Sequence, residues 1–153
     1  MNTVKTAPPG KTLLIVEDDI LPAMALRDAL QDAGYKVLDL TGRHQDGLAA
    51  AKESGPDLAL VNIELQGRDD GIVLAAELKA MGIPTLFISG QVGRARSANT
   101  VAIASLPKPY SVDDMVKAVD FLLARLAGGE TLHPPARLEV FDHTSGGVLP
   151  DAA

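Results

Sequence analysis

Apolar residues along the chain fall into short runs that alternate with amphipathic stretches. The apolar runs predict five strands, at Lys11–Val16, Val37–Leu40, Leu58–Asn62, Pro84–Ile88 and Val101–Ala104. Helical spacing follows each strand, from about residue 20 to the stop at Gly34, then over 46–53, 72–81, 92–99 and from 111 to about 127. No hairpin signal joins the strands, so the pattern predicts a parallel sheet covered by helices on both faces.

The third run is preceded by Gly55-Pro56 and begins with four apolar residues in a row. Leu58, Ala59, Leu60 and Val61 follow one another without a polar residue, which is typical of a central strand buried on both faces. Polar side chains then appear at Asn62 and Glu64. Because ligands of open α/β sheets bind at the carboxyl ends of the strands, we expect the functional site here.

Length and composition narrow the class of protein. The 153 residues suit one domain with tails, which we place at 1–10 for an N-terminal tail, 11–127 for the domain and 128–153 for a loosely ordered C-terminal tail. Within that tail, the alternation at 138–141 permits a short strand. A net charge of −6 argues against nucleic acid or an anionic membrane as partner, and the absence of cysteine excludes disulfides and thiolate metal sites. Without a bilayer-spanning run or a signal-like start, a cytoplasmic location is expected.

Polar groups of complementary chemistry follow four of the predicted strands. Carboxylates at the end of the first strand would bind a hard cation such as Mg²⁺ through oxygen. A hydroxyl after the fourth strand and an ammonium after the fifth would contact the oxygens of a phosphoryl group. The set comprises Glu17, Asp18, Asn62, Glu64, Ser89 and Lys108.

Four of these strand ends, taken together, resemble the receiver domains of bacterial response regulators. The matching pieces are Ile15–Asp19, the loop that ends in Asp70-Gly71, Ile88–Gly90 and Leu106–Tyr110, in order and with the expected spacing over about 11–127. The resemblance implies a flavodoxin-like (βα)5 fold with strand order 2-1-3-4-5. It also implies two-component phosphorelay signalling.

The resemblance assigns a role to each strand-end residue. Asp18 matches the acid that binds Mg²⁺ directly and Glu17 its water-mediated partner, while Glu64 would contribute its backbone carbonyl. Ser89 matches the hydroxyl that follows the phosphoryl group. Lys108 matches the ammonium that pairs with it.

Asn62 stands where this family carries the phosphoacceptor aspartate. An uncharged amide is a very poor nucleophile, so we expect the domain to be incompetent for phosphorylation. Asn62 also removes one anionic ligand from the metal set, so Mg²⁺ binding should be weakened or absent. The chain is then either a natural degenerate receiver or an engineered variant of a normal phosphoacceptor. Ser105 in place of the family's usual aromatic residue, and a loop at 66–71 without the usual proline, favour the natural one.

We therefore expect a stand-alone receiver that is not an enzyme and acts by protein contacts. Its partner would be a histidine kinase, a phosphotransfer protein or another regulator, bound through helix four, strand five and helix five, and the same surface is a candidate for homodimer formation. Two alternatives remain open: a flavodoxin-like module that binds a small ligand or cofactor, and a metal-dependent hydrolase of similar topology.

Overall fold

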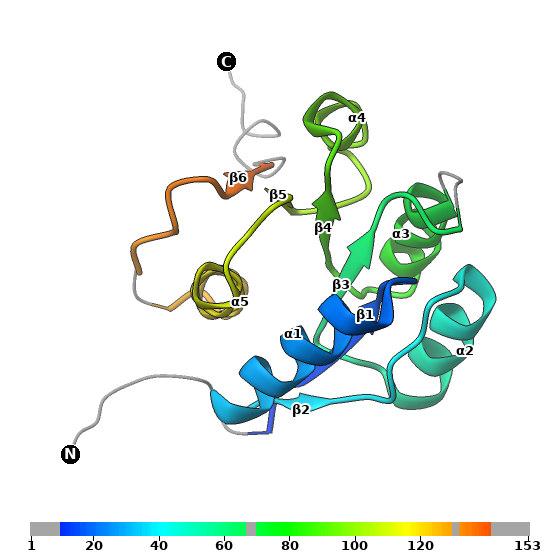
Figure 1. Cartoon of the computed structure of the whole chain (residues 1–153), viewed down its shortest axis with the longest axis horizontal. Helices are drawn as coiled ribbons and strands as arrows, with labels where there is room; N and C mark the ends of the chain where they lie inside the picture. The colour runs from blue at the N-terminus through cyan, green and yellow to red at the C-terminus, as the bar shows by residue number, and fades with distance from the viewer. Residues whose placement is uncertain (1–9, 67–69, 130–131, 142–153) are drawn as a thin grey trace.

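The computed structural model describes residues 10–66, 70–129 and 132–141, which form an α/β domain around a six-stranded sheet (Figure 1). The strand order is β2-β1-β3-β4-β5-β6, so the predicted doubly wound fold and the order 2-1-3-4-5 are confirmed, with one strand added. The first five strands are parallel and β6 is antiparallel to β5. The strands are β1 (Thr12–Val16), β2 (Lys36–Val37), β3 (Leu58–Asn62), β4 (Thr85–Ser89), β5 (Ala104–Pro107) and β6 (Glu139–Val140).

Helices cover both faces of this sheet, as Figure 1 shows. The two longest pack together over one face, and two shorter ones pack together over the other. The first pair is α1 (Ile20–Asp32) with α5 (Val112–Leu126), the second is α2 (His44–Ser54) with α3 (Asp70–Ala80), and the short α4 (Val92–Ser97) contacts β4 and β5.

The central strand β3 is buried at all five positions, as its apolar run predicts. Its side chains alternate between the two layers: Leu58 and Leu60 belong to the core under α1 and α5, whereas Ala59 and Val61 belong to the core under α2 and α3. Both faces of β3 are thus removed from water. Asn62, the last residue of β3, lies at the edge of the sheet formed by the carboxyl ends of the parallel strands.

Two predicted strand boundaries were wrong. The second strand is two residues long, and the fifth occupies Ala104–Pro107, three residues later than the apolar run at 101–104. The earlier residues are apolar for another reason: Val101 and Ala102 pack in the cluster that contains Phe87, in the turn that leaves α4. Their apolarity reflects packing beneath a helix rather than a strand.

The last described segment adds a strand within the region assigned from sequence to a tail. Val140 lies opposite Ala104, and Glu139 lies opposite Ser105. The alternation at 138–141 therefore corresponds to a real pairing with the edge of β5. Among the described residues, no helix is long and apolar enough to span a bilayer.

Candidate functional site

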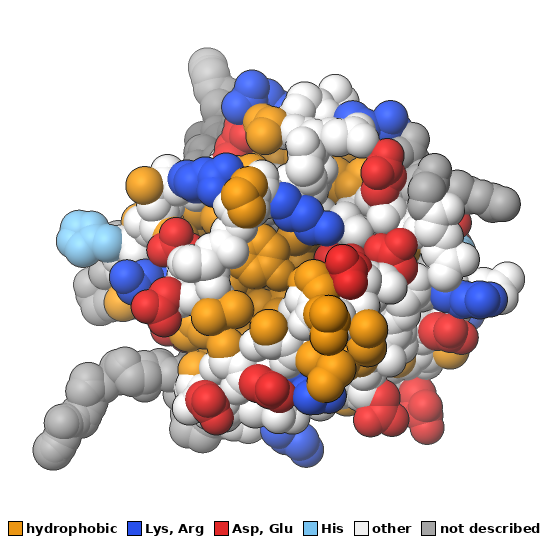
Figure 2. Space-filling model, viewed as in Figure 1, with side chains coloured by type: hydrophobic (Ala, Val, Ile, Leu, Met, Phe, Trp, Pro, Cys, Tyr) orange, Lys and Arg blue, Asp and Glu red, His pale blue; other side chains and the backbone are white. Residues whose placement is uncertain are grey.

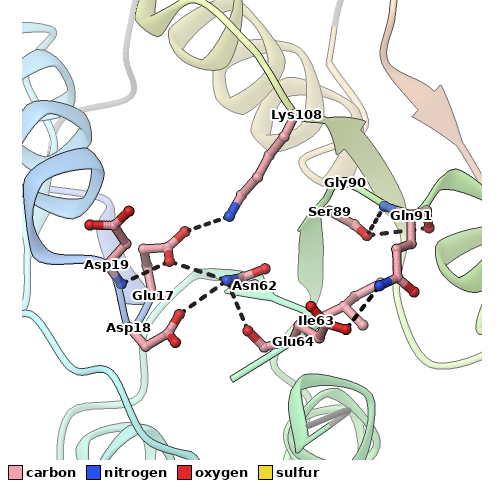
Figure 3. Close-up of a pocket in the computed structure, with 10 residues that line it drawn as sticks. All are labelled: Glu17, Asp18, Asp19, Asn62, Ile63, Glu64, Ser89, Gly90, Gln91 and Lys108. Atoms are coloured by element: carbon pink, nitrogen blue, oxygen red, sulfur yellow. Dashed lines mark hydrogen bonds and ion pairs between the residues drawn. The ribbon is translucent and has the colours of Figure 1, made fainter. Parts of the chain in front are cut away.

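The polar residues predicted at the strand ends come together at one edge of the sheet (Figure 3). The parallel register places Val16 beside Val61, Asn62 beside Ile88, and Ser89 beside Pro107, so the residues that follow these strands share one rim. They border a cavity of about 470 Å³. The lining consists of Glu17, Asp18, Asp19, Asn62, Ile63, Glu64, Ser89, Gly90, Gln91 and Lys108.

Asn62 lies at the centre of this cluster with its amide nitrogen facing three oxygens (Figure 3). Nδ2 lies 3.1 Å from Glu17 Oε2, 3.3 Å from Asp18 Oδ1 and 3.1 Å from the backbone carbonyl oxygen of Glu64. An amide group has two N–H donors, so the three acceptors share them. The side chain is only 6% exposed, and these contacts satisfy the amide nitrogen without water.

Glu17 is the buried acid of the site, at 3% exposure. Its Oε2 accepts hydrogen bonds from Asn62 and from the backbone N–H of Asp19 at 3.0 Å. Its Oε1 has no hydrogen-bond partner among the described residues but lies 3.2 Å from Lys108 Nζ. Because a buried carboxylate needs a counter-charge, the Lys108 ammonium is the group that compensates Glu17.

Asp18 lies on the exposed rim of the cavity. Its Oδ2 accepts a hydrogen bond from the backbone N–H of Gln66 at 3.0 Å. Burial by itself raises the pKa of Asp18, but the hydrogen bonds from the Gln66 backbone N–H and from the Asn62 amide outweigh it and hold the pKa below its ordinary value of 3.8. The site therefore favours the ionised form of this acid.

Ser89 and Glu64 are tied together by a residue that the sequence analysis did not identify. The backbone N–H of Gln91 donates to Ser89 Oγ at 2.8 Å, and Gln91 Nε2 donates to Glu64 Oε2 at 2.9 Å. Ser89 Oγ in turn donates to the Gln91 carbonyl at 3.2 Å. A glutamine two residues after a strand-end serine is ordinary turn composition, so nothing in the sequence marks it.

The loop that carries Lys108 is held on two sides. The backbone N–H of Lys108 donates to the Ser89 carbonyl at 2.8 Å, and the peptide bond between Lys108 and Pro109 is cis. Burial, and then the negative charge of Glu17, raises the pKa of Tyr110 to about 12, so this phenol stays neutral beside the site. The Lys108 ammonium lies 3.2 Å from the Glu17 carboxylate.

Gly71 is required by the way α3 begins against the end of β3. A Cβ atom on residue 71 would lie 2.2 Å from the Asn62 carbonyl oxygen and 2.7 Å from the Ile63 Cα. The Gly71 N–H donates to the Ile63 carbonyl at 3.0 Å, and this hydrogen bond stabilises the close approach of α3 to the end of β3. A side chain at position 71 would therefore displace the strand end that carries Asn62.

Whether this donor set suits a divalent cation depends on Asn62. Carboxylate and carbonyl oxygens are the ligands that Mg²⁺ prefers, and Asp18, Glu17 and the Glu64 carbonyl provide them. In this conformation, however, all three already bond the Asn62 amide nitrogen, which cannot bind a metal. The described residues contain no group of three or more His, Cys, Asp or Glu side chains placed to share an ion. In this conformation the Asn62 amide nitrogen therefore occupies the centre of the oxygen donor set.

Comparison with known proteins shows which family the chain resembles. A family model described as the response regulator receiver domain matches residues 13–120. The transcriptional regulatory protein PdtaR of Mycobacterium tuberculosis is 31% identical over 121 residues, which cover 75% of this chain and 58% of PdtaR. BvgA of Bordetella pertussis, described as a putative positive transcription regulator of virulence factors, is 27% identical over 131 residues, or 82% of this chain and 60% of BvgA. The chain thus spans about three fifths of the length of these relatives.

Solved structures agree with the fold. A putative response regulator from Chloroflexus aurantiacus superposes with a TM-score of 0.68 at 28% identity, covering 77% of this chain and all of that one. A CheY-like receiver domain protein from Methanospirillum hungatei gives a TM-score of 0.70 at 24% identity, over 77% of this chain and 97% of its own.

Proposed function

The chain belongs to the response regulator receiver domain family, and from this premise we propose that it is a receiver which signals without being phosphorylated at Asn62. Receiver domains work in two-component signalling, where a histidine kinase or phosphotransfer protein is the partner. In this proposal the chain is cytoplasmic, turns over no substrate, and acts by contact with such a partner or another regulator. Asn62 occupies the phosphoacceptor position.

One observation supports this proposal above the others: the Asn62 amide nitrogen bonds Glu17, Asp18 and the Glu64 carbonyl together. The partially positive N–H groups lie among acceptor oxygens that in a normal receiver would face a cation. Binding of Mg²⁺ would require these hydrogen bonds to break and the amide to turn its oxygen inward. We therefore propose that Mg²⁺ binds weakly or not at all.

The same geometry bears on phosphoryl chemistry. A phosphoacceptor must present a nucleophilic oxygen, whereas the amide oxygen of Asn62 is uncharged and its nitrogen lone pair is delocalised. Lys108 is engaged with Glu17 at 3.2 Å, and Ser89 Oγ is engaged with Gln91. We propose that these two residues would contact a phosphoryl group only if an aspartate replaced Asn62.

An apolar surface beside the site supports a function through protein contacts. A groove of about 540 Å³ lies next to Lys108 and is lined mainly by apolar parts of α1, of the loop before α5 and of the first residue of α5, including Pro22, Tyr110 and Val112. On the same helix α1, Ile20 and Leu21 are 55% and 72% exposed. Figure 2 shows hydrophobic side chains gathered on this face, over α1 and toward α5. Exposed apolar patches of this kind mark protein interaction sites.

Neither alternative from the sequence analysis is favoured. The Glu17 and Asp18 carboxylates border the cavity, and they would repel the phosphate of a nucleotide or flavin cofactor. A hydrolase of this topology needs a base two residues after its aspartate nucleophile, but the residues two positions after Asp18 and Asp19 are Ile20 and Leu21, which cannot act as bases. Both alternatives would also leave the match to the receiver family unexplained.

The proposal is tested by comparing wild type with Asn62→Asp and Asn62→Ala in the same buffer. Each protein is incubated with a small phosphodonor and Mg²⁺, and its intact mass is measured. We expect a gain of one phosphoryl group only in Asn62→Asp, and we expect Mg²⁺ titration to show at least tenfold tighter binding to that variant. A phosphorylated wild type, or equal Mg²⁺ affinity in wild type and Asn62→Asp, would refute the proposal.

A further inference from the structure

The edge of β5 is covered by a segment of the chain's own C-terminal region. Val140 and Glu139 pair with Ala104 and Ser105, and the Phe141 N–H donates to the Ile103 carbonyl at 2.8 Å. In Figure 1, β6 lies beside β5 at the end of the sheet that α4 borders. Without β6, β5 would be an open edge strand with unpaired backbone groups, which is a template for pairing with another chain.

Side chains on β6 recognise the two layers beside this edge. The Phe141 ring is 8% exposed and packs with Ala95 and Ala98, whose small side chains make room for it. Leu138 and Val140 pack against the core on the α1 and α5 side. Phe141, which directly follows β6, thus adds an aromatic ring to the cluster that contains Ala95 of α4.

A charge pair sets the direction and register of the segment. Glu139 accepts hydrogen bonds from Arg96 Nε on α4 at 2.9 Å and 3.2 Å. The Arg137 guanidinium also donates to the Pro109 carbonyl, in the loop that carries Lys108. The site therefore selects a strand with an apolar residue, an acid, a β-branched residue and an aromatic residue in succession.

The attachment of β6 is short, like that of the other edge strand, β2. It has two paired residues, against four for each of the pairs β1–β3, β3–β4 and β4–β5. Its ion pair is exposed, at 62% for the Arg96 side chain and 35% for that of Glu139, and exposed ion pairs contribute little. A segment held this way opens locally without unfolding the domain.

We propose that the β5 edge and the adjoining face of α4 form a strand-binding site, and that residues 138–141 are its internal ligand. A partner protein binds there by adding a strand of the same chemistry when the internal ligand leaves. This is the β-augmentation mode of recognition. It rests on the proposed function only in that the chain acts by contact with a partner protein.

The test uses the full chain with its internal ligand weakened by Val140→Asp and Phe141→Ala together. A fluorescent peptide with the sequence of residues 132–141 is titrated into this variant and into wild type, without Mg²⁺ or phosphodonor, and anisotropy is measured. We expect at least tenfold tighter binding to the variant, because wild type blocks its own site. Val73→Ala, an exposed change on α3, is the matched control and should behave as wild type.

Charge reversal identifies the site. A peptide carrying Glu139→Arg should bind the weakened variant at least threefold less tightly, and adding Arg96→Glu to the variant should restore that peptide's binding while weakening the original one. Equal binding of the original peptide to wild type and variant would overturn the proposal, as would no binding to a variant whose circular dichroism shows a folded domain. Self-association of the variant that the peptide does not reverse would make a second copy the occupant, and would also overturn it.

Hydrogen exchange on wild type provides a test that needs no variant. The Phe141 amide, bonded to Ile103, should exchange at least tenfold faster than the Ile63 amide, which is bonded to Ile88 in the centre of the sheet. Exchange of both amides at one slow rate would show that β6 leaves only on global unfolding and would refute the proposal. Neither the peptide titration nor the hydrogen-exchange measurement involves phosphate or Mg²⁺. Failure of the strand-binding proposal therefore leaves the proposed function of Asn62 standing, and failure of the proposed function leaves the strand-binding proposal standing.

Discussion

Two regions of this domain are filled by the chain itself, and they are filled in different ways. At the strand-end site, the Asn62 amide nitrogen bonds the oxygens around it. At the β5 edge, β6 takes the place of a neighbouring strand. The first occupant is a single atom of the central strand and cannot leave, whereas the second is a short segment that can detach.

Burial explains why the two regions differ in permanence. Glu17 and Asn62 are almost completely buried, so separating them would leave polar groups unsatisfied away from water. At the β5 edge, Arg96 and Glu139 reach solvent, which would hydrate both when they separate. We infer that the strand-end site is locked in one state and that the edge is the part of the molecule able to respond.

The largest effect is expected from Gly71→Ala, which attacks the strand-end site through its backbone support. A Cβ atom 2.2 Å from the Asn62 carbonyl oxygen cannot be accommodated without moving β3 or α3. We expect a loss of about 3 kcal/mol or more in the free energy of unfolding, measured by urea titration. Gly90→Ala is the matched control, because a Cβ there meets nothing within 4 Å. Equal stability of the two variants would show that the close approach is not required.

Asn62→Asp should convert the locked site into one that depends on a cation. A third carboxylate beside Glu17 and Asp18 should destabilise the metal-free domain by about 2–4 kcal/mol, from repulsion at an effective dielectric near 20. Added Mg²⁺ should recover much of this loss in thermal melts of the variant and leave wild type unchanged. Asn62→Ala adds no carboxylate, so its response to Mg²⁺ should be smaller than that of Asn62→Asp, and an equal response would contradict the explanation.

Phe141→Ala tests whether the β5 edge is independent of the core. Phe87→Ala, at a site with 0% exposure, should cost about 3–5 kcal/mol because it leaves a cavity in the core. Phe141→Ala should cost about 2 kcal/mol or less, because only the docking of β6 can be lost. In the Phe141→Ala variant, the amide of residue 141 should lose protection from hydrogen exchange, while the Ile63 amide keeps its protection. Loss of protection at both amides would show that the β5 edge and the core unfold as one cooperative unit.

The smallest effect concerns pH at the rim of the strand-end site. Because the folded-state pKa of Asp18 is lowered, its ionised form contributes stability that is present above its ordinary value of 3.8 and is lost as the pH falls through the folded-state pKa. Wild type should therefore melt above Asp18→Asn at neutral pH, with the difference shrinking below about pH 4. A difference that persists unchanged to pH 2 would assign the effect to something other than this charge.

Much of the strand-end site followed from the order of residues along the chain. A strand buried on both faces must be apolar throughout, so the run before Asn62 marked the central strand and its polar end. The start of α5, predicted at residue 111, also depends on residues close together in the chain. Ser111 Oγ accepts a hydrogen bond from the Asp114 N–H at 3.0 Å. The roles of Ser89 and Lys108, by contrast, came from family resemblance and stay predictions.

The sequence by itself determined the element order, the central strand and the set of polar strand ends, because burial and capping depend on residues close together in the chain. Only the tertiary structure decided which atom of Asn62 faces the acids, that Gln91 bridges Ser89 and Glu64, and that 139–140 complete the sheet. Each of these depends on a contact between segments far apart in sequence. Such a contact forms only after the sheet has brought its partners to one edge, and nothing in the local pattern of residues records it.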